Sequence, residues 1–297
     1  MKSDDILDTF ESCKSRWNIE SDENTSFMNY PNWIKEMSEP LADIVSSLMP
    51  RFEYYSHKIV NQTMVELHGE LKKGENIGNE NTIYCVLEDK DGRLNSGYEY
   101  LIEYRNLNKL SKYLVYPQLS RVSCEVLLSI QNIVYIDDFC GTGNTFINYL
   151  EKEKKQIEGK HVYYLVIHIM QQAIERIDKY SKEANLDIHI LYNKCADKVF
   201  KNTGDFWEKK SEFRKLSMEY GISSRNVLGY NNTEALTAFY NNTPNNTLGI
   251  FWQDTDTRKA LFPRENDERP QWMKMKNRKK ERNGSNYLKG CSNGRIY

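Results

Sequence analysis

The sequence predicts an α/β fold, in which a Rossmann-like parallel sheet with helices on both faces follows a helical extension and precedes an irregular cap. Two observations lead to this prediction. Four runs of strand length are continuously apolar, as are strands buried on both faces of a parallel sheet. Segments of helical periodicity lie between these runs, and this alternation is typical of parallel sheets. The four runs are residues 82–89, 133–137, 161–170 and 187–192.

Residues 1–80 are predicted to form the helical extension. Residues 41–49 indicate one helix, and Pro50 is expected to begin a longer one because proline favours the first helical turn. Apolar side chains recur at spacings of three and four residues along this second helix, which is expected to end at Gly74. The recurring side chains are those of Phe52, Tyr55, Ile59, Val60, Met64, Leu67 and Leu71.

Residues 81–195 are predicted to form the α/β core. Helices are expected at residues 97–107, 144–155 and 171–184, each after one of the apolar runs. Connections between parallel strands are right-handed, and ligands of such sheets bind at the carboxyl ends of the strands. Functional residues are therefore expected where the strands end.

The remainder of the chain is predicted to form two further parts. Residues 196–270 are rich in Asn, Thr and aromatic side chains and are expected to form the irregular cap, with a helix near 205–220. Residues 271–297 form a basic tail of net charge +7, which leaves −8 for the rest of the chain. Two interpretations of the tail stay open, namely contact with nucleic acid or an acidic partner protein, and a solvated terminus.

The composition is that of a globular protein, and the absence of an export signal leads us to expect a cytoplasmic one. No run of about 18 apolar residues occurs, so no membrane-spanning helix is expected. The N-terminal segment is acidic and polar and lacks the apolar core of a signal peptide. The six cysteines lie far apart without a C-x-x-C pair, which argues against a structural zinc site or redox motif and favours reduced thiols.

Two adjacent acids, Asp137 and Asp138, follow the second apolar run. They are expected at the rim of the sheet, where the chain leaves the pleat and both carboxylates can reach one ligand. Such a pair can accept hydrogen bonds from two neighbouring hydroxyls, as on a ribose, or help to hold a hydrated Mg²⁺ ion. The acids therefore predict a sugar-binding or magnesium-binding site.

The loop after the acids predicts a phosphate site. Two glycines permit positive φ and the close approach of a ligand, and the loop amides and the following helix N-terminus can converge on an anion. The loop lacks the Lys of a Walker motif and the third Gly of a dinucleotide-binding fingerprint. The remaining alternative is a structural turn between a strand and a helix. The loop consists of Gly141, Thr142, Gly143, Asn144 and Thr145.

The segment DDFCGTGNT, residues 137–145, resembles the signature of type I phosphoribosyltransferases. The resemblance implies that Asp137 and Asp138 are the catalytic acids, contact the ribose 2- and 3-hydroxyls of 5-phosphoribosyl pyrophosphate (PRPP), and serve as ligands of the Mg²⁺ cofactor. It further implies that residues 141–145 cradle the 5-phosphate.

The resemblance also implies an earlier pyrophosphate-binding loop, for which residues 88–97 are the candidate. Arg93 would bind the pyrophosphate, and Ser96 and Gly97 would open the next helix. The loop also carries three acids, so a surface turn is an equal alternative. Of the other candidates, His168 is expected to be packed in its strand, and packing is also the expected role of Cys140, although a thiol near a helix N-terminus can be reactive.

A second, narrower resemblance concerns residues 241–264 and the D-D-F-x-G-T-G-x-T form of the loop. Both are similar to phosphoribosyltransferase-like proteins of bacterial conflict and antiphage systems, including some retrons. This implies an effector that transfers a phosphoribosyl group or modifies a nucleotide, with a protein partner in a defence complex. A PRPP- or nucleotide-sensing module without turnover and a nucleobase salvage enzyme are the alternatives. The cap, with Trp252 for stacking, can hold the acceptor or pack on itself.

Overall fold

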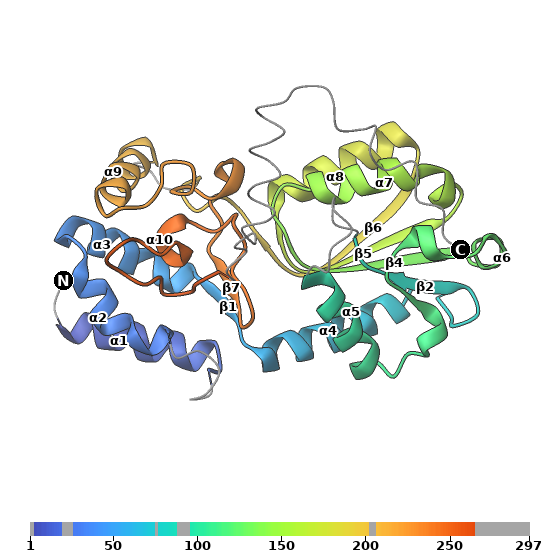
Figure 1. Cartoon of the computed structure of the whole chain (residues 1–297), viewed down its shortest axis with the longest axis horizontal. Helices are drawn as coiled ribbons and strands as arrows, with labels where there is room; N and C mark the ends of the chain where they lie inside the picture. Colours follow the sequence, from blue (N-terminus) through green and yellow to red (C-terminus); the bar gives the residue numbers. More distant parts are fainter. Residues whose placement is uncertain (1–2, 20–25, 75–76, 88–95, 202–205, 265–297) are drawn as a thin grey trace, which may run out of the picture. The chain divides into compact units, whose positions relative to one another are not determined.

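A five-stranded parallel sheet forms the centre of the fold in the computed structural model, which describes residues 3–19, 26–74, 77–87, 96–201 and 206–264 (Figure 1). The strand order is β3-β2-β4-β5-β6, and every neighbouring pair is parallel. The strands are β2 (Thr82–Cys85), β3 (Val115–Tyr116), β4 (Asn132–Cys140), β5 (His161–Met170) and β6 (Asp187–Ala196). The four predicted apolar runs correspond to β2, β4, β5 and β6.

Helices cover both faces of this sheet, which confirms the predicted fold class. One face packs against α4 (His57–Lys72) and α5 (Ser96–Leu107), and the other packs against α7 (Asn144–Ile157) and α8 (Gln171–Ala184) (Figure 1). A short helix, α6 (Cys124–Ser129), precedes β4. Alternate residues of β4 enter the two apolar layers, so the strand is buried on both sides, as its continuous apolar run predicts.

The single long helix predicted from Pro50 onward is wrong. Pro50 lies in a 3₁₀ turn, Met49–Arg51, and the chain then forms strand β1 (Glu53–Tyr55) before α4 begins. Ser56 caps α4, because its hydroxyl accepts a hydrogen bond from the Ile59 amide at 3.4 Å. β1 pairs in parallel with β7 (Thr237–Phe239), a segment far along the chain. Helical periodicity was therefore overridden by a long-range strand pairing.

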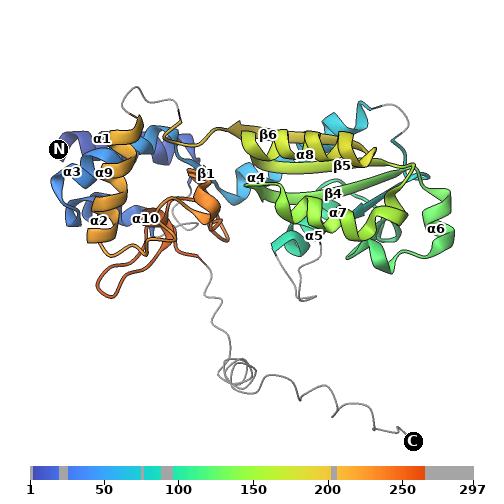
Figure 2. The same ribbon diagram turned by 90° about the horizontal axis from the view of Figure 1, so that it is seen from above.

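The N-terminal helices and the C-terminal region share a second hydrophobic core. Trp17 lies at its centre: its ring contacts Phe27, Phe52 and Phe262, and its indole N–H donates to the Phe52 carbonyl at 3.1 Å. The segments predicted as a separate extension and cap thus pack as one body, whereas α4 belongs with the sheet (Figure 2). The helices of this core are α1 (Ser3–Arg16), α2 (Tyr30–Trp33), α3 (Glu39–Leu48), α9 (Phe206–Glu219) and α10 (Gly249–Trp252).

Short 3₁₀ turns connect helices and strands along the described chain. They are Phe27–Asn29, Ile34–Glu36, Met49–Arg51, Lys112–Leu114, Leu119–Arg121 and Tyr230–Asn232.

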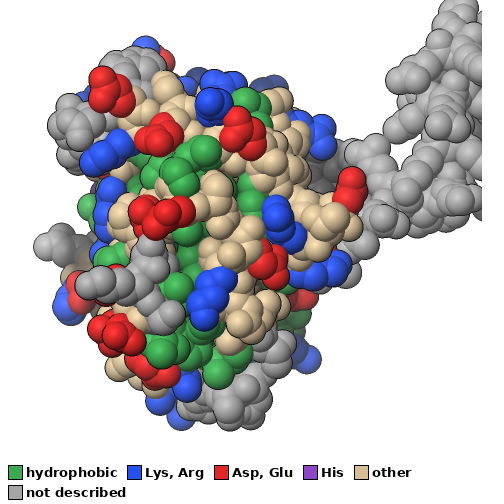
Figure 3. Space-filling view, turned by 90° about the vertical axis from the view of Figure 1, so that its left-hand side faces the viewer, with side chains coloured by type: hydrophobic (Ala, Val, Ile, Leu, Met, Phe, Trp, Pro, Cys, Tyr) green, Lys and Arg blue, Asp and Glu red, His purple; other side chains and the backbone are tan. Residues whose placement is uncertain are grey.

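The face that α1, α2, α3 and α9 present mixes hydrophobic side chains with charges of both signs (Figure 3). The described part of this face therefore lacks the basic stripe of a nucleic-acid-binding surface. The basic tail lies outside the described residues.

The described helices include none that is long and apolar enough to cross a membrane.

A buried ion pair connects α9 to the C-terminal region. The Lys210 ammonium lies 2.5 Å from the carboxylate of Glu234, whose side chain is fully buried and also accepts the Phe200 amide at 3.4 Å. We expect Lys210→Met to lower the free energy of unfolding by about 2 kcal/mol. This loss is smaller than the usual cost of about 3–5 kcal/mol for breaking a buried pair, because the Lys210 side chain is partly exposed to water. Urea denaturation measures this loss.

Lys215→Met is the matched control on the same helix. The Lys215–Glu219 pair is exposed and 4.0 Å long, so we expect no measurable loss of stability from this variant. Equal losses in the two variants would contradict a stabilising role for the buried pair.

Candidate functional site

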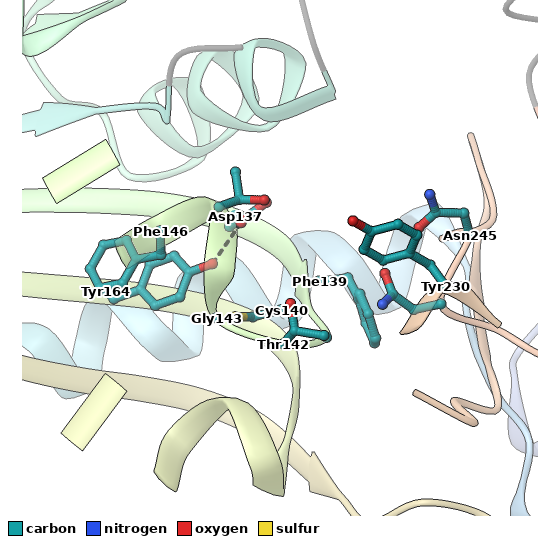
Figure 4. A pocket seen from close by; sticks show the side chains of 12 residues that line it. Asp137, Phe139, Cys140, Thr142, Gly143, Phe146, Tyr164, Tyr230 and Asn245 are labelled. Atoms are coloured by element: carbon teal, nitrogen blue, oxygen red, sulfur yellow. Dashed lines mark hydrogen bonds between the residues drawn. The ribbon is translucent and has the colours of Figure 1, made fainter. Parts of the chain in front are cut away.

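A cavity of about 470 Å³ opens at the carboxyl end of β4 (Figure 4). It is bounded by the end of β4, by the loop into α7, by β5, and by two segments of the C-terminal region. The lining residues are Asp137, Phe139, Cys140, Gly141, Thr142, Gly143, Thr145, Phe146, Tyr164, Tyr230, Asn245 and Asn246. The predicted acid-and-loop segment therefore forms one wall of a cavity at the predicted edge of the sheet.

Among the described residues that line this cavity, Asp137 alone carries a carboxylate. One of its oxygens accepts the Tyr164 hydroxyl at 2.6 Å, and the other accepts the Asp138 amide at 3.0 Å (Figure 4). Burial, followed by the negative charge of Asp138, raises the pKa of Asp137 well above its ordinary value. The two hydrogen bonds hold the carboxylate in place, and each oxygen keeps a lone pair for a ligand hydroxyl.

Asp138 lies outside the cavity lining. The structure extends the strand through Cys140, so the pleat continues past the acids instead of ending at them. The Asp138 carboxylate accepts the Phe139 amide at 2.8 Å. The charge of Asp138 acts on Tyr100 of α5, a helix on the opposite face of the sheet from α7. Burial and, after it, this charge raise the pKa of Tyr100 well above its ordinary value. The structure thus brings one of the two predicted acids to the cavity wall.

The two loop glycines are needed for different reasons. Gly143 is the N-cap of α7 and has φ of +75°, a left-handed conformation that other residues rarely adopt. Gly141 allows close packing, because a Cβ atom there would lie 2.4 Å from Nδ2 of Asn246. Gly143 therefore shapes the turn, and Gly141 lets the C-terminal region approach the loop.

The loop offers neutral donors for an anion. Gly143, the N-cap of α7, has no side chain to cap the helix, and the Asn144 amide donates to the Thr142 hydroxyl at 3.4 Å. The other amides of the first turn and the helix dipole favour an anion at this end of the helix. Thr142 and Thr145 line the cavity, whereas Asn144 accepts a hydrogen bond from Arg176 of α8. The described lining contains no Lys, Arg or His. Anion binding at these residues would therefore depend on backbone amides and hydroxyls.

Aromatic residues form the other walls, and most of them were not predicted. Tyr164 and Phe146 stack with their ring centres 4.0 Å apart, which positions the Tyr164 hydroxyl on Asp137 (Figure 4). A sequence signal existed for Tyr164, since it lies on the strand adjacent to the acid-bearing one. Tyr230 had no signal, because its place depends on the fold of the C-terminal region.

The Asn-rich block reaches the cavity, but Trp252 does not line it. Asn245 and Asn246 are lining residues. The Trp252 indole instead donates to the Thr247 carbonyl at 2.7 Å, and the Arg264 guanidinium lies 5.5 Å from its ring centre. Tyr230, whose side chain is 53% exposed, is thus the aromatic residue that the C-terminal region presents to the cavity.

The candidate pyrophosphate loop falls largely outside the described residues, which exclude 88–95 and with them Arg93. Ser96 and Gly97 open α5, as predicted. Gly97 is buried and does not belong to the described lining of the cavity.

His168 is packed in β5, as expected. Its Nδ1 atom lies 3.1 Å from the Tyr55 hydroxyl, and its ring contacts Phe139. Phe139 lines the cavity, whereas His168 does not. Burial and the nearby charge of Lys194 lower the pKa of His168 to about 3, so the imidazole is neutral at physiological pH.

Cys140 is buried at the cavity wall, and burial together with the charge of Asp137 raises the pKa of its thiol to about 12. We therefore expect Cys140 to resist alkylation by iodoacetamide at neutral pH, while the exposed Cys124 reacts readily. Peptide mapping by mass spectrometry after timed labelling measures both rates. Labelling of Cys140 as fast as that of Cys124 would contradict the packed, protonated state.

One family model matches most of the chain. The model of the PRTase-CE family matches residues 31–264. No curated protein matches the sequence.

Three solved structures are similar at low identity. A Helicobacter pylori xanthine-guanine-hypoxanthine phosphoribosyltransferase is 15% identical with a TM-score of 0.33, and the match covers 55% of this chain and 96% of that one. An Aeropyrum pernix orotate phosphoribosyltransferase is 11% identical with a TM-score of 0.32, and the match covers 47% of this chain and 70% of that one. A hypoxanthine-guanine-xanthine phosphoribosyltransferase is 11% identical with a TM-score of 0.30, and the match covers 46% of this chain and 74% of that one. TM-scores this low support no conclusion about the site.

Proposed function

This chain belongs to the PRTase-CE family, a phosphoribosyltransferase-like family, and we propose that it binds PRPP, or a related ribose-5-phosphate nucleotide, and transfers the phosphoribosyl group to an acceptor. The observation that supports this proposal is the shared cavity of Asp137 and the loop at residues 141–145. A carboxylate for a sugar diol and a ring of amide and hydroxyl donors for a phosphate are what a ribose 5-phosphate requires.

The binding mode follows from these donors and acceptors. The 5-phosphate would accept hydrogen bonds from the loop amides and from Thr142 and Thr145. The ribose hydroxyls would donate to the free lone pairs of Asp137, whose orientation Tyr164 fixes. Because the described lining carries no cationic side chain, the pyrophosphate would need positive charge from outside it. Arg93, within the predicted pyrophosphate loop, is the proposed source on this chain.

A Mg²⁺ ion fits this donor set. Mg²⁺ is usually held by one or two carboxylates together with substrate phosphates and waters, and Asp137 supplies one carboxylate at the cavity wall. Asp138, the other predicted ligand, would contribute only from outside the described lining. When bound with the pyrophosphate, the ion would neutralise part of the leaving-group charge.

The reaction would be a displacement at the ribose C1 carbon. A lone pair of the acceptor forms the new bond to C1 while the bond from C1 to the pyrophosphate oxygen breaks, and the electron pair of that bond leaves with the pyrophosphate. The proton that the acceptor N–H or O–H loses passes to the pyrophosphate or to water. The contribution of this chain would be to hold the 5-phosphate and the diol fixed, so that C1 faces the acceptor. Tyr230, Asn245 and Asn246, which line the cavity from the C-terminal region, would contact the acceptor.

Pyrophosphate release from PRPP in the presence of Mg²⁺, with nucleobases, nucleotides or water as acceptor, tests the proposal. We expect release by the wild-type chain and none by the double variant Asp137→Asn with Asp138→Asn. Activity that survives in the double variant would refute the assignment of the site.

A PRPP- or nucleotide-sensing module without turnover is the second candidate. It is favoured by the lining of the cavity, where Asp137, Cys140 and Tyr164 all have raised pKa values and no described residue is a ready acid or base for an acceptor. A thermal shift with PRPP and Mg²⁺ separates the two candidates, because a sensor would be stabilised by the ligand without releasing pyrophosphate.

The proposal extends to biological context. The resemblance of residues 241–264 to antiphage proteins supports a role as the effector of a bacterial defence system, acting with a protein partner. Bacteria carrying the complete system should lose protection against phage when the chain bears Asp137→Asn. Unchanged protection would contradict an effector role for this site.

A further inference from the structure

A cluster of metal-ligand side chains lies at the opposite edge of the sheet from the candidate site. His161 is the first residue of β5, and Asp187 is the first residue of β6. The strand register places these two residues directly side by side, and His189 follows two residues after Asp187 on the same face of β6. Two neighbouring strands therefore present the three side chains together, at the amino ends of the strands.

The donor atoms of this cluster already converge. The Nδ1 atom of His161 lies 2.5 Å from one oxygen of Asp187, and the Nε2 atom of His189 lies 3.0 Å from the other. All three ligand atoms lie within 4.8 Å of one another. The His189 ring stacks on Tyr163, with ring centres 4.9 Å apart, which limits its rotation. The convergence is therefore set by strand register and ring packing.

The chemistry of the donors selects the type of metal. Two imidazole nitrogens and one carboxylate oxygen suit zinc and similar first-row transition metals, whereas Mg²⁺ and Ca²⁺ prefer oxygen ligands alone. All three side chains are exposed, so a bound ion would retain coordination positions open to water. His57 is a comparison for a simple pair: its Nε2 lies 2.6 Å from Glu103, and no three-ligand group among the described residues includes it.

We propose that His161, Asp187 and His189 form a binding site for a divalent transition-metal ion of the zinc class. The ion would bridge β5 and β6 and thereby stabilise the end of β6, the last strand in the sheet order. This site is separate from the proposed sugar-phosphate site and does not depend on it.

Zinc titration of the chelator-treated full chain, followed by calorimetry, tests the proposal. We expect one high-affinity zinc ion per chain and a rise of the melting temperature with zinc. The double variant His161→Ala with His189→Ala should lose both effects, and Asp187→Asn should weaken binding by at least about tenfold. Since all three side chains are exposed, the variants should fold, and circular dichroism checks this.

Two controls make the result specific. His57→Ala should leave zinc binding unchanged, because it removes an exposed histidine that pairs with a carboxylate elsewhere. Substitution of cobalt for zinc should give a spectrum without thiolate-to-metal charge transfer, which excludes binding by the cysteines. Unchanged zinc binding in the double variant, or no zinc binding by the wild-type chain, would overturn the proposal.

Discussion

Asp137→Asn is expected to weaken PRPP binding by about 100-fold, because the carboxylate would lose its charge-assisted hydrogen bonds to two ribose hydroxyls, together worth about 3 kcal/mol. Asn preserves the shape of the side chain, and its amide can still pair with the Tyr164 hydroxyl and the Asp138 amide. Calorimetric titration with PRPP and Mg²⁺ measures the loss. Asp138→Asn should lose less, since Asp138 lies outside the described lining.

The same substitution is expected to stabilise the protein without ligand. Burial and the charge of Asp138 raise the pKa of Asp137 above 3.8, so the folded protein holds this proton more tightly than the unfolded chain. Stability therefore falls as pH rises from about 4 through the raised pKa, and Asn avoids this loss because it cannot ionise. The melting temperature of Asp137→Asn should exceed that of the wild type at neutral pH, and the difference should vanish in acid. A variant less stable at neutral pH would contradict the raised pKa.

Gly143→Val is expected to destabilise the fold and the loop together. The left-handed φ of +75° costs other residues about 1–2 kcal/mol. A Cβ atom would also lie 3.2 Å from Cγ1 of Ile177 and 3.3 Å from the Ala173 carbonyl oxygen, which adds an overpacking cost of similar size. We expect the free energy of unfolding to fall by about 3 kcal/mol, measured by urea denaturation.

Gly159→Val separates the cost of the left-handed φ from the cost of overpacking. Gly159 has nearly the same φ, +74°, but a Cβ atom there would meet nothing within 4 Å. Its variant should lose only the backbone contribution of about 1–2 kcal/mol. Equal losses at the two positions would contradict the close packing of the loop against α8.

The centre of the sheet was predictable because β2, β4 and β5 are largely buried. Continuous apolar runs identified β2, β4, β5 and β6, and the helices between them fixed a parallel arrangement. β1 was not predictable, because its three residues form a strand only through pairing with Thr237–Phe239. Periodicity describes neighbours along the chain and contains no information on partners this far apart.

The candidate site was predictable where one segment builds it. Asp137 and most of the loop that follows it lie on one cavity wall, because a strand, a turn and a helix in sequence place them there. The walls contributed by Tyr230, Asn245 and Asn246 depend on how the C-terminal region packs. The exclusion of Asp138 depends on how far the strand continues, and strand ends are difficult to locate from sequence.

A crystal structure of the full chain with PRPP and Mg²⁺ tests the central claim most directly. We predict the 5-phosphate on the amides of residues 141–145 and the ribose diol on the carboxylate of Asp137. A PRPP molecule bound elsewhere, or one whose diol does not contact Asp137, would contradict the assignment of this cavity as a sugar-phosphate site.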